Sequence, residues 1–261
     1  MKALRLGVVP YLNVSPIIHG LIGDPRFEIV PELPSTLSDR LHAGEVDLGM
    51  IPSIEYARGD YRIVPGIAIG SRGPVGSVCL FNRAPLDQVR RVALDASSRT
   101  SVALLRILLG GLLKSEPEYV TLPPPIESML GAADAALAIG DPALYFRGEA
   151  QKVDLGELWQ ETTGLPFVFA FWAGRPGAVG RMEVAALQAS LVEGLRSIPA
   201  IASSYNGHGR ARAAENEEYL RSRIVFELGE SQVRGLHEFY RRAEAARLIP
   251  AVPEITFYEH R

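Results

Sequence analysis

Short apolar runs alternate along the chain with amphipathic stretches. The apolar runs are rich in Val, Ile and Leu, a composition typical of buried strands. In the stretches between them, apolar residues recur three and four positions apart, which indicates helices. Gly44 follows one such stretch at 36–43 and is the expected C-terminal cap. The pattern predicts strands at 4–9, 27–31, 46–51, 64–69, 77–81, 92–94, 119–122, 135–139 and 167–172, and helices that begin near 16, 36, 53, 100, 126, 184, 217 and 232.

One part of this pattern occurs twice. Residues 41–51 (LHAGEVDLGMI) and 130–139 (LGAADAALAI) both read as the end of a helix, a glycine, an aspartate and an apolar strand. Strands joined by helices are typical of α/β proteins with a mostly parallel sheet. The repeat therefore predicts an α/β protein of two similar lobes, and the helices after residue 184 are expected to cover the first lobe.

Four strand-to-helix junctions are candidate ligand contacts. The start of a helix presents unpaired N–H groups and the positive end of its dipole, which suits a carboxylate or phosphate oxygen. Two junctions fall in the first third of the chain and two in the middle third, so two facing lobes would enclose a small anion between them. The junctions are VVPYLNVSP (8–16), MIPS (50–53), LDASSRTS (94–101) and AIGDP (138–142).

The same junctions also have a purely structural interpretation. Ser and Thr are preferred helix N-caps, and Asp141 before Pro142 suits a capped helix start. Asn13 fits either a turn or a hydrogen-bonding group that faces a ligand. The turn SSRTS at 97–101 differs, because a cap needs one hydroxyl and this turn has four beside an arginine. It is the strongest candidate for a ligand contact.

Composition and charge narrow the class of protein. The 261 residues are 47% hydrophobic, enough for two lobes with cores of their own. Lys and Arg number 27 against 30 Asp and Glu, without a block of one sign, so neither nucleic acid nor a membrane surface is an expected partner. The single cysteine, Cys79, lies in an apolar run and predicts a buried thiol rather than a disulfide.

The first residues, MKALRLGVV, fit a buried strand better than a signal peptide, because Pro10 follows them and no cleavage site does. No segment reaches the roughly 18 apolar residues of a membrane-spanning helix. We therefore expect a cytoplasmic protein, and the sequence leaves its oligomeric state open.

Most common catalytic motifs are missing from the sequence. Its five histidines are scattered without metal-ligand spacing, so no metal is expected. The stretch GGLLKS (110–115) lacks a glycine directly before Lys114 and lies late in a helical pattern, unlike a phosphate-binding loop. The chain also lacks Gly-x-Gly-x-x-Gly and Gly-x-Ser-x-Gly, which argues against nicotinamide chemistry and serine hydrolysis.

Six stretches instead form an ordered set of more distinctive motifs: PYLNVSP (10–16), GEVDLG (44–49), PGIAIGSRGPVGSVCLF (65–81), LDASSRTSV (94–102), AIGDPAL (138–144) and DLGELWQETTGLPFVFAFWA (154–173). Together they resemble the chorismate dehydratases, the first enzymes of the futalosine route to menaquinone. The similarity spans residues 8–173 almost without interruption, whereas the C-terminal third matches only in general character.

The resemblance implies a type 2 periplasmic-binding-protein-like fold, in which two α/β lobes hold a ligand between them. The two crossings between lobes would fall near 82–86 and 169–174. The first lobe would then comprise residues 1–84 and 173–261, and the second lobe residues 85–172.

The resemblance also implies a reaction and a site. Members of the family remove water from chorismate to give 3-[(1-carboxyvinyl)oxy]benzoate, without a cofactor. Asn13 and Ser77 are carried over as the catalytic pair. The substrate-binding set comprises Pro52, Ser53, Ser98, Arg99, Thr100, Ser101, Gly140 and Asp141.

No His or Glu in these motifs is suited to removing the ring proton. The enolpyruvyl carboxylate of chorismate, held beside that hydrogen, is one candidate base, which would make the elimination substrate-assisted. Asp141 is the competing candidate, although its place before Pro142 also fits a helix cap.

Three other functions remain in view. The sister enzyme that cleaves cyclic dehypoxanthine futalosine has Ile-His-Glu where this chain has Ile139, Gly140 and Asp141. A solute receptor of a transporter would share the lobes but needs export, and neither a signal peptide nor a lipid-anchoring cysteine is recognisable. A ligand-sensing regulator would need a DNA-binding module, which the sequence does not indicate.

Overall fold

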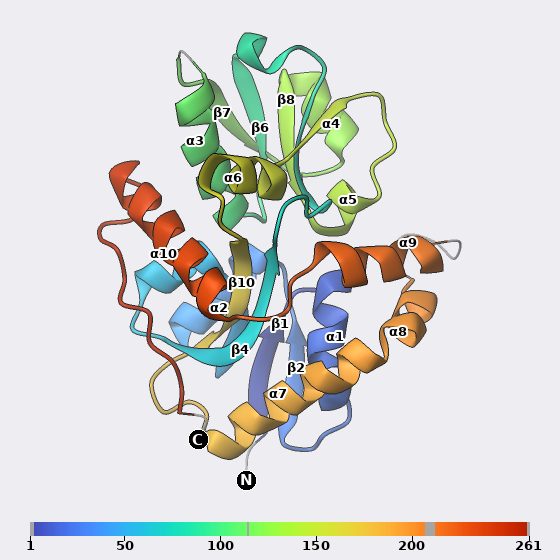
Figure 1. Cartoon of the computed structure of the whole chain (residues 1–261), viewed down its shortest axis with the longest axis vertical. Coiled ribbons are helices and arrows are strands. Elements are labelled where there is room, and N and C mark those ends of the chain that lie inside the picture. Colours follow the sequence, from blue (N-terminus) through green and yellow to red (C-terminus); the bar gives the residue numbers. More distant parts are fainter. Residues whose placement is uncertain (1–2, 114, 207–211, 260–261) are drawn as a thin grey trace.

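The computed structural model describes residues 3–113, 115–206 and 212–259. It consists of two lobes, one above the other in Figure 1, and each lobe is built on a five-stranded sheet. The predicted α/β fold of two lobes is confirmed.

The sheet of the first lobe has the order β2-β1-β3-β10-β4. Strand β1 is parallel to its neighbours β2 and β3, whereas β10 runs antiparallel to its neighbours β3 and β4. The strands are β1 (Leu4–Val8), β2 (Phe27–Pro31), β3 (Leu48–Pro52), β4 (Arg62–Ser71) and β10 (Phe167–Gly174).

The sheet of the second lobe repeats this arrangement in the order β7-β6-β8-β5-β9. Strand β6 is parallel to β7 and β8, and β5 is antiparallel to β8 and β9. The repeat read from the sequence is therefore structural, but each sheet is mixed rather than mostly parallel. The strands are β5 (Val78–Asn82), β6 (Arg91–Asp95), β7 (Glu118–Leu122), β8 (Ala135–Ile139) and β9 (Gln151–Asp154).

The chain crosses between the sheets earlier than the family resemblance implies. Strand β5 belongs to the second sheet and β10 to the first, so the crossings lie at 72–77 and at 164–166. The expected crossing at 169–174 falls within the paired strand β10, and the one at 82–86 begins at the last residue of β5, where the chain is already part of the second sheet. Ser77 consequently stands at the end of a crossing, directly before β5.

Most of the predicted helices form within a few residues of their expected limits. The segment from Ser53 is a short 3₁₀ helix rather than an α-helix, and β9 and α6 were not predicted. The α-helices are α1 (Ser15–Ile18), α2 (Pro34–Ala43), α3 (Thr100–Leu112), α4 (Ile126–Ala132), α5 (Gly140–Leu144), α6 (Leu155–Thr163), α7 (Arg181–Arg196), α8 (Ile198–Ser204), α9 (Ala213–Glu218) and α10 (Glu230–Ala245). The 3₁₀ helices are η1 (Leu12–Val14), η2 (His19–Leu21), η3 (Ser53–Arg58) and η4 (Leu86–Gln88), and η5 (Tyr219–Arg223) is a π-helical turn.

Strand alternation buries both faces of the second sheet. In β5, Leu80 packs into the main core, whereas Cys79 and Phe81 face a smaller cluster that contains Ile126 and Met129 of α4. Successive side chains of a strand point to opposite faces, which explains this division. Cys79 is buried as predicted, and burial raises the pKa of its thiol.

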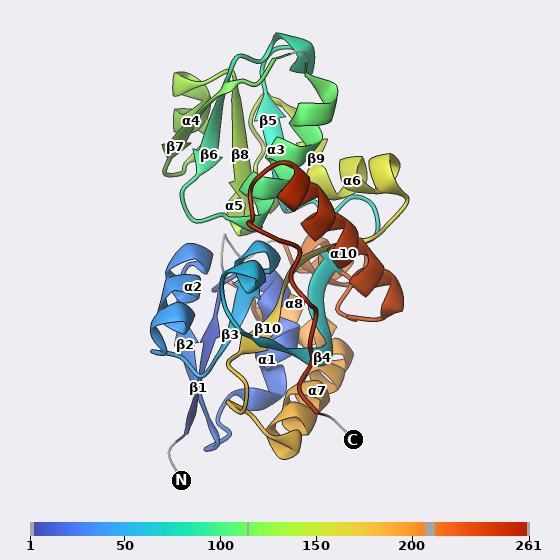
Figure 2. The same cartoon turned by 90° about the vertical axis from the view of Figure 1, so that its left-hand side faces the viewer.

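Helices α7 and α8 lie against the first lobe, as expected, whereas Figure 2 shows α10 at the boundary, where it contacts β10 of the first lobe and α3 of the second. Helix α7 approaches α1 closely at Gly194, where an added Cβ would lie 2.7 Å from the Cα of Pro16. Because Pro16 follows η1, this contact also supports the segment that carries Asn13.

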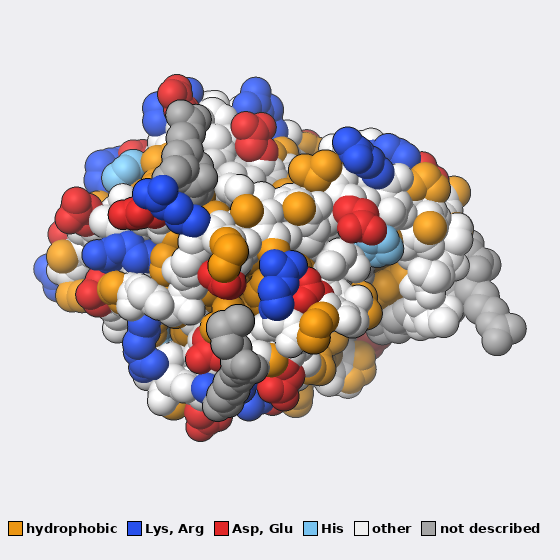
Figure 3. All heavy atoms as spheres, turned by 90° about the horizontal axis from the view of Figure 1, so that it is seen from below, with side chains coloured by type: hydrophobic (Ala, Val, Ile, Leu, Met, Phe, Trp, Pro, Cys, Tyr) orange, Lys and Arg blue, Asp and Glu red, His pale blue; other side chains and the backbone are white. Residues whose placement is uncertain are grey.

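On the face seen from below, the described side chains form no large patch of a single charge or of hydrophobic residues. Figure 3 shows basic and acidic side chains interspersed there, with single hydrophobic side chains between them. Within the described ranges, every helix is too short or too polar to cross a bilayer.

We expect Gly194→Ala to lower the free energy of unfolding by about 1–3 kcal/mol, because its Cβ meets the backbone of Pro16. Gly110→Ala, in α3, is the matched control. An added Cβ there meets nothing within 4 Å, so the substitution should stabilise by about 0.5–1 kcal/mol. Denaturant unfolding of both variants tests the close packing of α7, which equal effects would contradict.

Candidate functional site

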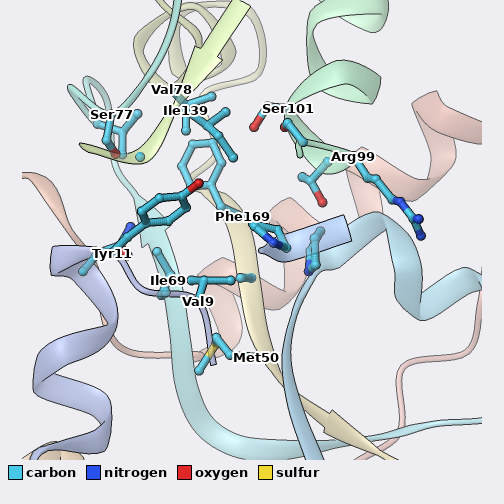
Figure 4. Close-up of a pocket in the computed structure, with 18 residues that line it drawn as sticks. Val9, Tyr11, Met50, Ile69, Ser77, Val78, Arg99, Ser101, Ile139 and Phe169 are labelled. Atoms are coloured by element: carbon cyan, nitrogen blue, oxygen red, sulfur yellow. The ribbon is translucent and has the colours of Figure 1, made fainter. Parts of the chain in front are cut away.

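A cavity lies between the two lobes, with about 590 Å³ of empty space including its opening to solvent. Figure 4 shows side chains from both lobes and from the crossing converging on it. The cavity is lined by Val9, Tyr11, Asn13, Pro34, Met50, Pro52, Ile69, Val75, Ser77, Val78, Ser98, Arg99, Thr100, Ser101, Ile139, Gly140, Phe169 and Ala170. Eight of the ten site residues predicted from the sequence are therefore in this set, and Ser53 and Asp141 are not.

Tyr11 and Gly140 bring the lobes together at one side of the cavity. Gly140 has a positive φ of 63°, and a Cβ there would lie 2.9 Å from ring atoms of Tyr11. Only glycine adopts this backbone conformation without strain and also leaves room for the ring. Burial raises the pKa of Tyr11 to about 12, so its phenol stays protonated near neutral pH.

Asn13 and Ser77 are joined by a third side chain, Tyr219. The Nδ2 atom of Asn13 donates to the Tyr219 hydroxyl at 3.2 Å, and that hydroxyl donates to Ser77 Oγ at 2.8 Å. All three side chains are at least nine-tenths buried. The predicted pair therefore lies together at one wall of the cavity, within one hydrogen-bonded array.

No motif in the sequence pointed to Tyr219. It lies in a segment predicted simply as a helix at 217–226, and it follows Asn13 by about 200 positions. The available signal is weak: a tyrosine on the apolar face of a helix, whose buried hydroxyl needs a partner. In the structure the segment is the π-helical turn η5, a feature often found at functional sites.

The turn before α3 faces this array from the second lobe. Ser98 and Ser101 line the cavity, and Arg99, the N-cap residue of α3, makes no capping hydrogen bond with its side chain. The side chain of Arg99 therefore leaves the first N–H groups of this 13-residue helix uncapped. Neutral hydroxyls and the positive end of the helix dipole together suit a carboxylate.

Thr100 links the lobes. Its Oγ1 accepts a hydrogen bond from Ile54 N at 3.0 Å and lies 3.4 Å from Ser53 Oγ. The Ser53 hydroxyl donates to Val168 O at 2.8 Å. The anion site expected at the start of η3 is therefore occupied by a side chain of the opposite lobe, because closure of the lobes brings Thr100 onto that N–H group.

Arg99 also binds the opposite lobe. Its guanidinium donates to the buried Glu55 at 2.8 Å and to Asp39 at 2.9 Å, and Figure 4 shows the side chain extending away from the other labelled groups. Glu55 also accepts from Arg58 and contacts His42. Among the described residues, Arg99 is the arginine that lines the cavity, and carboxylates of the first lobe balance its charge.

Asp141 lies beside the cavity rather than in it. Its Oδ1 atom accepts from Leu12 N at 3.3 Å, and its Oδ2 atom accepts from the Tyr205 hydroxyl. It lines a neighbouring depression with Tyr11 and Tyr205. Asp141 therefore holds the start of η1, the segment that carries Asn13, although it belongs to the opposite lobe.

No group of three His, Cys, Asp or Glu side chains suited to a metal occurs within 3–113, 115–206 and 212–259. The cavity is lined mainly by apolar side chains and hydroxyls. Its geometry suits a small molecule that carries carboxylates on an apolar body.

The class of protein follows from the fold. A protein from Archaeoglobus fulgidus aligns with a TM-score of 0.74 at 21% identity, covering 95% of this chain and 99% of that one. The periplasmic aliphatic sulphonate binding protein SsuA from Escherichia coli aligns with a TM-score of 0.68 at 19% identity, covering 97% and 95%. The chain has the periplasmic-binding-protein fold.

Sequence comparison identifies the family more closely. A family described as menaquinone biosynthesis matches residues 4–245, and the chain belongs to it. A chorismate dehydratase from Thermus thermophilus is 33% identical over 225 residues, 78% of this chain and 82% of that protein. A 1,4-dihydroxy-6-naphtoate synthase from the same organism is 30% identical over 175 residues, 64% of each chain. A chorismate dehydratase from Campylobacter jejuni is 30% identical over 63% of this chain and 64% of that one.

We expect Arg99→Ala to loosen the contact between the lobes. Loss of a charged hydrogen bond of about 1.4 kcal/mol would make opening about ten times more frequent. The Ile54 N–H group reports on this directly, because its acceptor is Thr100 of the opposite lobe. Its hydrogen exchange, measured by NMR, should become about tenfold faster.

Arg58→Ala is the matched control for this experiment. It removes another arginine from Glu55, but one that belongs to the same lobe. Exchange at Ile54 should stay within about twofold of the unaltered protein, since the pair between the lobes is kept. Equal acceleration in both variants would show that Arg99 does not hold the lobes together.

Proposed function

We propose that this protein is a hydro-lyase that dehydrates chorismate to 3-[(1-carboxyvinyl)oxy]benzoate in menaquinone biosynthesis. The observation that carries the proposal is the array of Asn13, Tyr219 and Ser77 in a cavity between the lobes, opposite the start of α3. Family membership and the chorismate dehydratase relatives give the substrate class.

Chorismate is a dicarboxylate on an apolar ring, which suits a cavity of this kind. We assign Ser98, Ser101 and the first N–H groups of α3 to one carboxylate. Apolar side chains such as Phe169 and Ile69 would pack against the ring. Because these contacts are neutral dipoles, they bind the anion without the desolvation of a further buried charge.

Asn13 and Ser77 are assigned to the ring hydroxyl that leaves. A hydrogen bond donated by the Ser77 hydroxyl stabilises the negative charge that develops on this oxygen as its bond to carbon breaks. Asn13 holds the same hydroxyl through its Oδ1 atom. The neighbouring ring C–H bond breaks too, and its electron pair forms the new double bond of the aromatic ring.

The proton from that C–H bond is assigned to the enolpyruvyl carboxylate of chorismate itself. Among the described residues that line the cavity there is no His, Asp or Glu to compete with it. Asp141 is the less suitable base, because its two oxygens accept from Leu12 N and from Tyr205. The proton leaves with the hydroxyl as water, so the reaction needs no co-reactant.

Purified protein mixed with chorismate alone should release an aromatic product lighter by one water, detectable by mass spectrometry and ultraviolet absorbance. Tight binding without turnover would contradict the proposal and favour a solute receptor of the same fold. Another control is cyclic dehypoxanthine futalosine, the substrate of the sister enzyme considered from the sequence, which should not be consumed. Its consumption would identify the sister activity instead.

We expect Asn13→Ala and Ser77→Ala each to lower kcat for chorismate by about 10²–10³-fold, while the dissociation constant changes by less than about threefold. These groups act on charge that develops only in the transition state. Steady-state kinetics and calorimetric titration separate the two effects. Equal losses of turnover and affinity would contradict the assigned roles.

A further inference from the structure

We propose that Tyr219 is the positioning residue of this site: its hydroxyl sets the direction of the hydrogen bonds that Asn13 and Ser77 offer to the substrate. The proposal rests on the proposed dehydration of chorismate. Tyr219 contacts both side chains but is not among the residues that line the cavity, so it acts through them.

The single proton of the Tyr219 phenol determines the direction of both hydrogen bonds. A phenol has one proton, and Tyr219 donates it to Ser77 Oγ at 2.8 Å. Toward Asn13 the phenol oxygen is then an acceptor, so the Nδ2 atom of Asn13 must face it, at 3.2 Å. One phenol therefore fixes the orientation of the amide and of the hydroxyl together.

Ser77 and Asn13 each keep one hydrogen-bonding group that can bind a ligand. With a lone pair of Ser77 Oγ taken by Tyr219, the serine proton is free to be donated elsewhere. Asn13 Oδ1 is buried and has no hydrogen-bond partner among the described residues. The array thus presents one donor and one acceptor, the pair needed to hold a hydroxyl group as it leaves.

Burial keeps this arrangement constant. Tyr219 is 2% exposed, and desolvation raises the pKa of its phenol despite its hydrogen bonds with Ser77 and Asn13, which lower it. The phenol therefore stays protonated near neutral pH, as a fixed donor. It is ill suited to release a proton, because a buried phenolate would be poorly solvated.

The array also joins three separate parts of the fold. Asn13 comes from η1 of the first lobe, Ser77 from the crossing and Tyr219 from the turn η5 near the C-terminus. Ser77 is further held by its carbonyl, which accepts from Gly140 N of the second lobe at 2.8 Å. Tyr219 thus ties the first lobe to the crossing where the second lobe begins.

The test is Tyr219→Phe, which removes the hydroxyl and keeps the ring. We expect kcat for chorismate to fall about 10–100-fold, because both side chains lose their fixed orientation, while KM changes by less than about threefold. Tyr56→Phe is the matched control. Tyr56 is also buried, and its hydroxyl bonds Glu254 O and Thr256 instead, so kcat should stay unchanged.

A double variant separates positioning from a general loss of stability. If Tyr219 acts through Ser77, the substitution Tyr219→Phe should cost much less in a Ser77→Ala background than in the unaltered protein. Equal costs in both backgrounds would overturn the proposal. The two outcomes remain distinguishable from failure of the proposed function, since no turnover of chorismate by the unaltered protein would refute that function first.

A second replacement covers the case in which Tyr219→Phe does not fold. The residue p-aminophenylalanine at position 219 keeps the size of the side chain and donates to Ser77, but its amino group is a poor acceptor for Asn13. We expect the folded variant to have a kcat at least about tenfold below that of the unaltered protein. Full activity would overturn the role assigned to the phenol oxygen.

Discussion

A polar group buried where the two lobes meet is costly without a hydrogen-bond partner, and three groups at this interface have their partners in the opposite lobe. Thr100 accepts from the N–H group at the start of η3, and Asp141 accepts from the one at the start of η1. Arg99 pairs with the buried Glu55 in the same way. An unpaired group at any of these positions would cost about 1–3 kcal/mol, so these pairs favour the closed arrangement.

This constraint determines the electrostatic character of the cavity. Arg99 is paired with Glu55 and Asp39, and the other described residues that line the cavity are apolar or neutral. A neutral site that binds through hydroxyls and a helix N-terminus can hold an anion without trapping a counter-charge inside it. The proposed elimination therefore assigns the base to the bound molecule itself, a substrate that becomes aromatic when it loses water.

The outline of the fold and part of the site were predictable for physical reasons. Strand and helix periodicity predicted most elements, and the helix, Gly, Asp and strand order of 41–51 and 130–139 predicted two lobes that share one topology. The resemblance placed Asn13 and Ser77, which the structure brings to one wall of the cavity. Ser53 does not line the cavity, and the sequence could not show this, because a helix start looks the same in sequence whether a ligand or a distant threonine binds it.

By itself, the sequence determined the properties that depend on near neighbours: which runs form strands, which helices begin at a hydroxyl-rich turn, and where glycine permits a positive φ. Only the tertiary structure determined which N–H groups at helix starts face the cavity and which donate to a side chain of the opposite lobe. It also brought Tyr219 between Asn13 and Ser77, although about 200 and 140 residues separate it from them. The physical reason is that a hydrogen bond depends on distance in space, and local periodicity carries no information about contacts so far apart in the chain.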